Sequence, residues 1–188
     1  MRKLFPIFIL HLLSTTAFGN ALSGVAAPIL SISGNVLSVT TPSGAVQKIH
    51  ANHPISVTDV SFEDLNFDGY PDIKVFNSAG NVERFYSVYL YDSRSKTYRL
   101  DSGFSKVPCV EADKYTHEVV GACFHASACE NWVERYSVDQ RNRLTLVSRK
   151  GTYCNPSTGE SFSYDDRFKN GRRISSRTTQ LRSDEDRN

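Results

Sequence analysis

Residues 64–72 read Asp-Leu-Asn-Phe-Asp-Gly-Tyr-Pro-Asp and stand between two short segments of β character. The segment 55–62 leads into this stretch, and Ile73 and Val75 alternate with polar residues directly after it. This alternation predicts a strand, whereas an EF-hand loop continues into a helix and closes with a glutamate, where this chain has Val75. The stretch therefore predicts a tight loop between two β-strands.

The same loop carries oxygen atoms suited to a hard cation. The predicted ligands stand at its first, third, fifth, seventh and ninth places: Asp64, Asn66, Asp68, the backbone carbonyl of Tyr70, and Asp72. Gly69 permits the sharp turn that lets such a loop close around an ion. Ca²⁺ binds oxygens at about 2.3–2.6 Å and would offset the repulsion between the carboxylates. We predict a structural Ca²⁺ site; the alternative is a turn whose side chains cap their own backbone.

The remainder of the chain is also patterned for β-structure. Gly34-Asn35, between two apolar alternating segments, predicts a two-residue hairpin. Further strands are expected at 84–91, 97–100, 118–124, 132–138 and 144–147. No segment sustains an apolar period of 3.6 residues over three turns. We predict an all-β protein, a single domain of short antiparallel strands arranged as a sandwich or a propeller-like meander, with two disulfides.

The N-terminus is typical of an exported protein. Arg2 and Lys3 precede an apolar run, and Ala17-Phe18-Gly19 offers small residues for cleavage, which predicts a signal peptide over 1–19. Removing it leaves 20 basic and 20 acidic residues, so no net positive charge favours nucleic acid. No later stretch is long and apolar enough to insert into a membrane. We expect a protein of the periplasm or the medium.

Cysteine content agrees with an oxidising compartment. The four cysteines are Cys109, Cys123, Cys129 and Cys154. An even number without a zinc-like spacing predicts two disulfides. Three pairings are open, and we favour Cys123–Cys129 with Cys109–Cys154.

The C-terminal residues differ in composition from the rest. We place the all-β domain at 20–166 and a basic, flexible tail at 167–188. Asn170-Gly171 would suit one further hairpin, and the alternative to a solvated tail is a basic arm that contacts anionic envelope material.

No catalytic motif is evident, and we predict that the protein is not an enzyme. The histidines are scattered, and none adjoins a nucleophile motif. The charged segment 111–118 contains Glu111, Asp113, His117 and Glu118, and its irregular pattern predicts a solvated loop rather than a metal or acid/base site.

The loop at 64–72 and the aromatic strand Tyr86-Ser87-Val88-Tyr89-Leu90-Tyr91-Asp92 together resemble a known family. These are exported bacterial proteins typified by the immunity protein against a lysozyme-like, peptidoglycan-cleaving effector of a bacteria-killing type IV secretion system. That family is similar to the periplasmic inhibitors of invertebrate-type lysozyme. The resemblance covers about residues 55–150 and implies an all-β fold, a Ca²⁺ loop, and loops that enter a hydrolase cleft. The Ser-Gly-x-x-Tyr loop of several lysozyme inhibitors has no match here.

The resemblance implies a periplasmic protein that binds and inhibits a peptidoglycan hydrolase or lysozyme-like partner. The alternative is a Ca²⁺-stabilised envelope binding module for glycan or a surface protein. Tight inhibitor interfaces depend on a few buried aromatic or arginine anchors. The partner-binding candidates by residue type are Tyr86, Tyr91, Arg135 and Tyr153; Tyr89 and Trp132 are also candidates but are expected in the core.

Overall fold

The computed structural model describes residues 28, 30–80, 83–123, 129 and 131–181. Within these residues the chain forms strands and two short 3-10 turns, η1 (Val57–Asp59) and η2 (Phe104–Lys106). The strands are β1 (Leu30–Ser33), β2 (Val36–Thr40), β3 (Val46–His50), β4 (Val60–Glu63), β5 (Asp72–Ala79), β6 (Arg84–Asp92), β7 (Thr97–Asp101), β8 (Val110–Asp113), β9 (Glu118–Cys123), β10 (Trp132–Val138), β11 (Leu144–Cys154), β12 (Ser161–Lys169) and β13 (Arg172–Gln180). The predicted all-β class is confirmed. The predicted signal peptide lies outside the described residues, in which no helix is long and apolar enough to span a bilayer.

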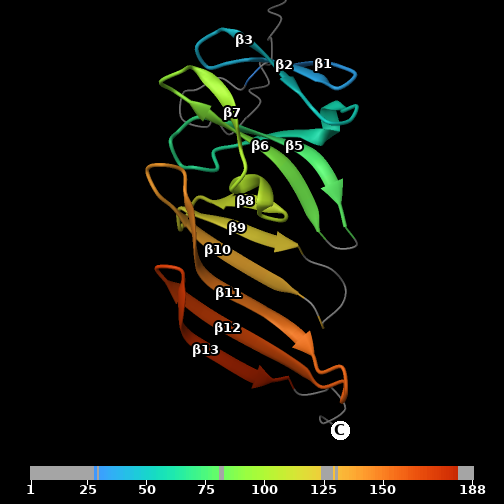
Figure 1. The fold of residues 1–188 in the computed structure, drawn as a ribbon, viewed down its shortest axis with the longest axis vertical. Coiled ribbons are helices and arrows are strands. Elements are labelled where there is room, and N and C mark those ends of the chain that lie inside the picture. The colour runs from blue at the N-terminus through green and yellow to red at the C-terminus, as the bar shows by residue number, and fades with distance from the viewer. Residues whose placement is uncertain (1–27, 29, 81–82, 124–128, 130, 182–188) are drawn as a thin grey trace, which may run out of the picture.

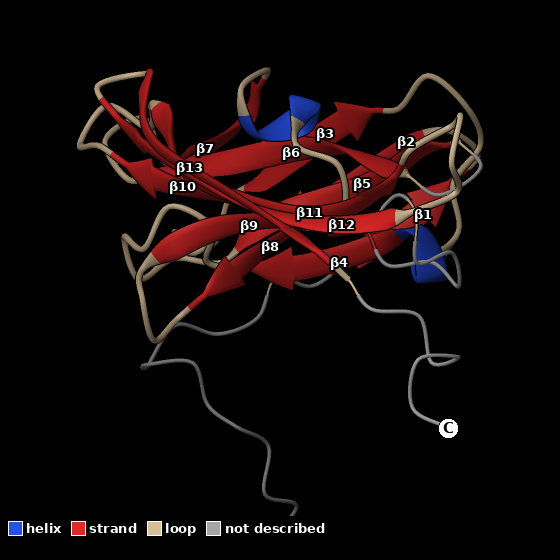
Figure 2. Ribbon diagram, turned by 90° about the horizontal axis from the view of Figure 1, so that it is seen from below, coloured by secondary structure: helices blue, strands red, loops and turns tan. Residues whose placement is uncertain are grey.

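The strands form three antiparallel sheets. Within each sheet, strands that follow one another in the chain are paired. The sheets contain β1–β3, β4–β7 and β8–β13, and they follow one another along the long axis of the molecule (Figure 1). Seen along that axis, most strands run across the molecule and the turns gather at its two ends (Figure 2). The predicted meander is therefore present, and it places alternate turns on the same side of the protein.

The middle sheet is buried on both faces. Ile73 and Tyr91 belong to one apolar cluster, which also includes Leu37 and other residues of β2 and β3. Val88 and Leu90 belong to a second cluster, which extends to η2, β8 and β9. This explains the continuous apolar run in β6, because a strand covered on both faces loses the polar half of its alternation.

The C-terminal part differs from the prediction. Residues 161–180 form the β12–β13 hairpin, which extends the third sheet beyond the predicted boundary at residue 166. Asn170 and Gly171 both adopt left-handed conformations, with φ of 50° and 72°, as a two-residue hairpin turn requires. Nearly all of β13 is polar and exposed, so apolar periodicity gave no signal for it. The prediction of a flexible tail was therefore wrong for residues 167–180. Residues 182–188 lie outside the described residues.

The disulfides form, but the favoured pairing was wrong. Cys109 bonds to Cys123, and Cys129 bonds to Cys154, with Cα–Cα separations of 5.4 Å and 4.8 Å. The first bridge joins the open end of the β8–β9 hairpin, and the second joins that of β10–β11. Strand pairing brings these ends together, whereas Cys123 and Cys129 stand on either side of a connection and face different neighbours.

Loss of either bridge should destabilise the protein without changing its fold. In the chain-entropy account each bridge closes a loop whose constraint is worth about 3 kcal/mol. The double variant Cys129→Ser/Cys154→Ser should therefore unfold at a lower urea concentration, and its free energy of unfolding should depend on urea at least as steeply as that of wild type, because its unfolded chain is less compact. Equilibrium unfolding checks this, and an unchanged midpoint would contradict it.

Candidate functional site

The loop between β4 and β5 is held by its own side chains. Glu63 and Asp72 are paired across the two strands, so residues 64–71 form a tight connection. The Asp64 carboxylate accepts the N–H groups of Asp68 at 3.1 Å and Gly69 at 2.9 Å. Asp68 in turn accepts the N–H of Tyr70 at 2.9 Å. The first and fifth residues of the motif thus point into the loop, as both the ion-binding and the capping interpretations require.

Asp72 is the buried end of the motif. Its side chain is fully buried and accepts two backbone N–H groups, from Leu65 and from Tyr91 of β6, each at 2.9 Å. The pKa of this carboxyl is raised to about 8, chiefly by burial; the nearby carboxylates of Asp68 and Asp64 contribute to the rise, and the two N–H donors oppose it. Burial also raises the pKa of Asp64. Negative charge in this loop is therefore costly unless a cation shares it.

The oxygen atoms of this loop are the type of ligand that Ca²⁺ prefers, although the side chains are not gathered around one point. Among the described residues, no three His, Cys, Asp or Glu side chains gather as a ready metal site. The Asn66 amide and the Asp68 carboxylate are in contact at 3.1 Å, and Gly69 has φ of 87°. Side-chain oxygens crowd this turn, and no basic side chain in the described part of the chain bonds to them, which is the chemistry that a hard cation would satisfy.

The metal-free protein should lose stability as pH rises. The pKa of Asp72 in the folded chain, about 8, exceeds the unfolded value near 4, so the folded chain holds more protons between these values. In EDTA the free energy of unfolding should therefore fall from pH 5 to pH 8, by about 1.4 kcal/mol per unit of pKa separation at most. Urea titrations across this range check the sign, and the variant Asp72→Asn should show a flatter profile.

An open cleft lies beside this loop. It measures about 630 Å³ and is bounded by three segments: Asn66–Asp68 of the loop, the β6–β7 turn from Tyr91 to Arg94, and the β10–β11 turn from Val138 to Asn142. The Asn66 amide donates to the Asn142 side chain at 3.2 Å, which joins the loop to a turn 76 positions away. We call this feature the turn cleft.

Three hairpin turns share one construction, and two of them border the cleft. Asp92, Asp113 and Asp139 each open a hairpin turn and accept N–H groups from the residues that follow, at 2.8–3.4 Å. The turns then close at residues with left-handed backbone: Lys96, His117 and Asn142. The Ser95 hydroxyl lowers the pKa of Asp92, the Arg135 guanidinium lowers that of Asp113 to about 2, and the N–H of Arg143 lowers that of Asp139 to about 2. These three aspartates therefore stabilise the conformation of their own turns.

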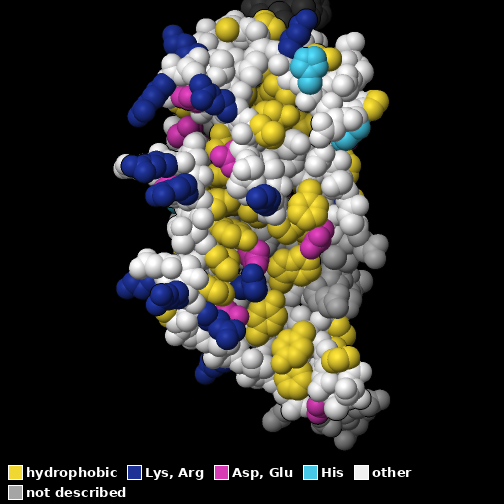
Figure 3. All heavy atoms as spheres, viewed as in Figure 1, with side chains coloured by type: hydrophobic (Ala, Val, Ile, Leu, Met, Phe, Trp, Pro, Cys, Tyr) yellow, Lys and Arg dark blue, Asp and Glu magenta, His cyan; other side chains and the backbone are white. Residues whose placement is uncertain are grey.

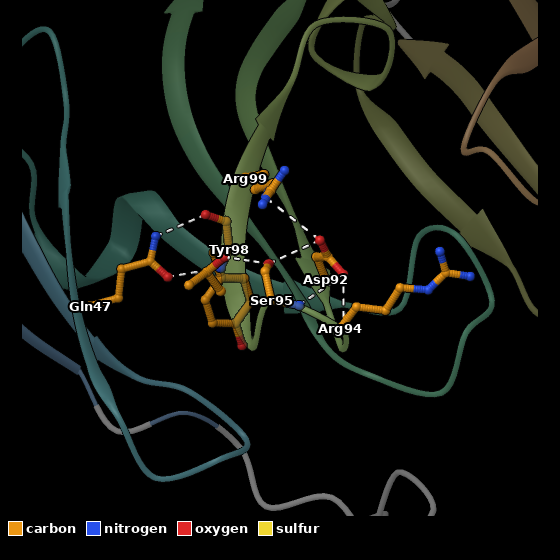
Figure 4. Close-up of polar contacts among 7 residues, drawn as sticks. Gln47, Asp92, Arg94, Ser95, Tyr98 and Arg99 are labelled. Carbon is orange, nitrogen blue, oxygen red and sulfur yellow. Dashed lines mark hydrogen bonds and ion pairs between the residues drawn. The ribbon is translucent and has the colours of Figure 1, made fainter.

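The basic side chains of these turns project into solvent. In Figure 4 Asp92 faces its own turn and Arg99, while the Arg94 side chain extends away from these contacts. The exposed basic residues of the turns on this side are Arg94, Lys96, Lys114, Arg141, Arg143, Lys169 and Arg172. Figure 3 shows Lys and Arg side chains gathered along the same edge of the molecule. We call this row of turns the basic edge.

The predicted partner-binding residues do not come together. Tyr91 is buried in the core between Tyr70 and Tyr98. Tyr86 is half-buried, and Lys74 lies over its ring. Tyr153, by contrast, is 42% exposed and stacks on Phe162 of β12. Of these three tyrosines only Tyr153 offers a largely open surface, and it lies in the third sheet.

Arg135 serves the structure of the β8–β9 turn. It donates to Asp113 at 2.8 Å and to Glu118 at 3.0 Å. The segment 111–118, predicted as an irregular loop, is therefore a hairpin whose two ends are joined by an arginine from β10. Trp132 and Tyr89 are half-buried, and Tyr89 packs against the apolar cluster that contains Ile73 and Tyr91.

Sequence reasoning did not find the contributions of Asn142 and Arg141 to the cleft. The turn 139–142 was recognised only as a connection, although it opens with an aspartate, as the turns at Asp92 and Asp113 do. The order of the strands in the sheets determines which turns lie side by side, and the local sequence of a turn does not indicate that order.

The fold is similar to a solved structure described as a Xanthomonas Type IV Secretion System related protein. The similarity covers 79% of this chain and 78% of that chain, with a TM-score of 0.59 and 17% sequence identity. At this identity the likeness concerns the fold. No protein family matches the chain, and comparison with curated proteins found no match. The structure shows an all-β protein with two disulfides, and the comparison shows that its fold is similar to that of the Xanthomonas protein.

Proposed function

We propose that the protein binds and inhibits a peptidoglycan hydrolase in the periplasm. The observation that supports this most is the basic edge beside the turn cleft, where capped turns hold exposed arginines on a cross-linked β scaffold. Glycan-cleaving enzymes commonly use a pair of carboxylates in an extended cleft. A projecting turn that offers an arginine matches such a cleft in charge, since guanidinium binds carboxylate in a bidentate manner.

Rigidity supports the same proposal. In each turn the leading aspartate accepts two or three hydrogen bonds from the residues that follow it, so little conformational freedom remains to be lost on binding. The disulfide-bridged hairpins agree with function in an oxidising compartment. The fold shared with a secretion-related protein is compatible with this role.

An activity assay tests the proposal. The purified protein is mixed with chicken-, goose- and invertebrate-type lysozymes and with any hydrolase encoded beside its gene, and lysis of peptidoglycan is followed. We expect one hydrolase to lose activity at a stoichiometric amount of the protein. Full activity of every enzyme at excess protein would overturn the proposal.

A glycan-binding module is the second candidate, and one observation favours it. Tyr153 stacks on Phe162 with ring centroids 5.2 Å apart and lies 6.4 Å from Tyr164, on a sheet face that also carries the Glu134–Arg149 ion pair. Aromatic and charged side chains of this kind suit sugars. Saturable binding to purified glycan strands, without inhibition in the assay above, would favour this candidate.

We further propose that Ca²⁺ stabilises the loop at 64–72, held by Asp64, Asn66, Asp68, Asp72 and the carbonyl of Tyr70. The support is the set of side-chain oxygens that crowd this turn and the raised pKa of Asp64 and Asp72. The ion would neutralise the loop's carboxylates and fix its position beside the turn cleft.

Calcium should raise the melting temperature, and magnesium should do so much less, because Mg²⁺ demands a smaller octahedral shell. At 100 times the dissociation constant, binding adds about 2.7 kcal/mol to the free energy of unfolding. Asp64→Ala/Asp68→Ala should abolish this response, while Asp59→Ala, outside the loop, should keep it. Calorimetry with EDTA, Ca²⁺ and Mg²⁺ measures the shift, and a full Ca²⁺ response in the loop variant would exclude this site.

A further inference from the structure

Tyr115, at the tip of the β8–β9 turn, has the most exposed large apolar side chain of the described residues. Its exposed fraction is 101%, whereas Val46 in β3 and Leu100 in β7 reach 70% and 61%. Single exposed apolar residues are ordinary on protein surfaces, so exposure by itself does not indicate a function. Tyr115 differs in how firmly the backbone beneath it is held.

The turn that carries Tyr115 is fixed from two sides. Asp113 accepts the N–H groups of Tyr115 at 3.0 Å and of Thr116 at 3.3 Å. Arg135, on β10, donates to the carboxylates of Asp113 and Glu118, one at each end of the turn. Arg135 also donates to the Thr116 hydroxyl at 3.2 Å. The backbone at Tyr115 is thus held in place while its ring extends into solvent.

This turn is continuous with the turn cleft through the loop at 64–72. The Phe67 ring of that loop lies against His117 of the turn, with ring centroids 5.3 Å apart. The neighbouring residue Asn66 lines the cleft and donates to Asn142. A standard interface covers about 800 Å² on each partner, which is much larger than one turn. A partner seated on the turn cleft would therefore extend over the β8–β9 turn.

A hollow lies beside the Tyr115 ring. It measures about 380 Å³, and its lining includes Glu111, Lys114 and Val120 together with Tyr115 itself. A projecting ring next to a hollow provides a surface that interlocks with a partner. Glu111 and Lys114 give the hollow charges of both signs, so a polar side chain of the partner suits it.

We propose that Tyr115 is the aromatic anchor of this surface and seats in an apolar pocket of the inhibited hydrolase. This inference rests on the proposed inhibition and adds a contact separate from the arginines of the turn cleft. A tyrosine ring supplies a large contact area at low entropic cost, because it has only two rotatable side-chain bonds. Its hydroxyl remains available for a hydrogen bond at the rim of the pocket. The fixed turn lowers the cost of binding further, since its backbone is ordered beforehand.

Removing the ring should weaken inhibition without weakening the fold. With the hydrolase that wild type inhibits, Tyr115→Ala should raise the inhibition constant at least about thirtyfold, as expected for an aromatic hot spot. Tyr115→Phe should retain most of the affinity. The matched control, Leu100→Ala, removes another exposed apolar side chain from β7 and should stay within about threefold. All three variants should melt close to wild type, because the altered side chains are exposed.

A tryptophan at position 115 reports burial of the anchor directly. On addition of the hydrolase, Tyr115→Trp should shift its emission to shorter wavelength and become protected from acrylamide, whereas Leu100→Trp should do neither. The native Trp132 contributes the same background to both variants.

The outcomes separate this inference from the proposed function. If wild type inhibits no hydrolase, both fail. If wild type inhibits and Tyr115→Ala inhibits equally well, or the new tryptophan stays open to acrylamide in the complex, the anchor is wrong and the inhibitory function stands.

Discussion

Replacing Asp72 by alanine is expected to lower the free energy of unfolding by about 3–5 kcal/mol. The carboxylate is fully buried and is the acceptor for the N–H groups of Leu65 and Tyr91. Removing it leaves two buried donors without a partner, at about 1–3 kcal/mol each, together with a cavity. Because one donor lies in the loop and the other in β6, the loop would also lose its attachment to the middle sheet. Urea unfolding in EDTA measures the effect apart from any ion.

Two further variants make this result specific. Asp72→Asn keeps the volume and one acceptor oxygen, so it should be destabilised less than Asp72→Ala. Asp59→Ala removes a half-buried carboxylate that accepts two hydrogen bonds from Ser56 at the start of η1, and it should lower stability by only about 1 kcal/mol. An Asp72→Ala protein as stable as Asp59→Ala would show that these two hydrogen bonds do not hold the loop.

Charge reversal in the turn cleft is expected to abolish inhibition of the target hydrolase. Arg94→Glu/Arg141→Glu replaces two exposed guanidinium groups that border the cleft. Arginine anchors at interfaces are often worth about 2 kcal/mol each, so the inhibition constant should rise by about a thousandfold. The Asp92 and Asp139 caps bind backbone N–H groups at these positions, which glutamate also supplies, so both turns should keep their conformation.

The matched control reverses two charges elsewhere. Lys48 lies in β3, and Arg84 begins β6 at the end opposite the β6–β7 turn; both are exposed. Lys48→Glu/Arg84→Glu changes the net charge equally and should leave the inhibition constant within about threefold. Equal losses in both double variants would indicate long-range charge attraction rather than contact through the turn cleft.

Local sequence determined much of this protein. The strand-forming residues of 84–91 and 132–138 predicted β6 and β10 with nearly correct bounds, and Gly34-Asn35 and the loop at 64–72 marked connections that are present. These features depend on neighbouring residues, because strand alternation and left-handed turn positions are set by side chains within a few positions. The even cysteine count likewise indicated two disulfides.

Tertiary structure decided what depends on strand order. The cysteine pairing follows from which hairpin ends meet, and the position of Asn142 beside Asn66 follows from the stacking of sheets. The exposed strand β13 forms because β12 supplies hydrogen-bond partners, although its own residues carry no apolar pattern. A sequence specifies each hairpin through local contacts. Only long-range pairing determines which hairpins share an edge, because the backbone groups that join them are the same in every residue.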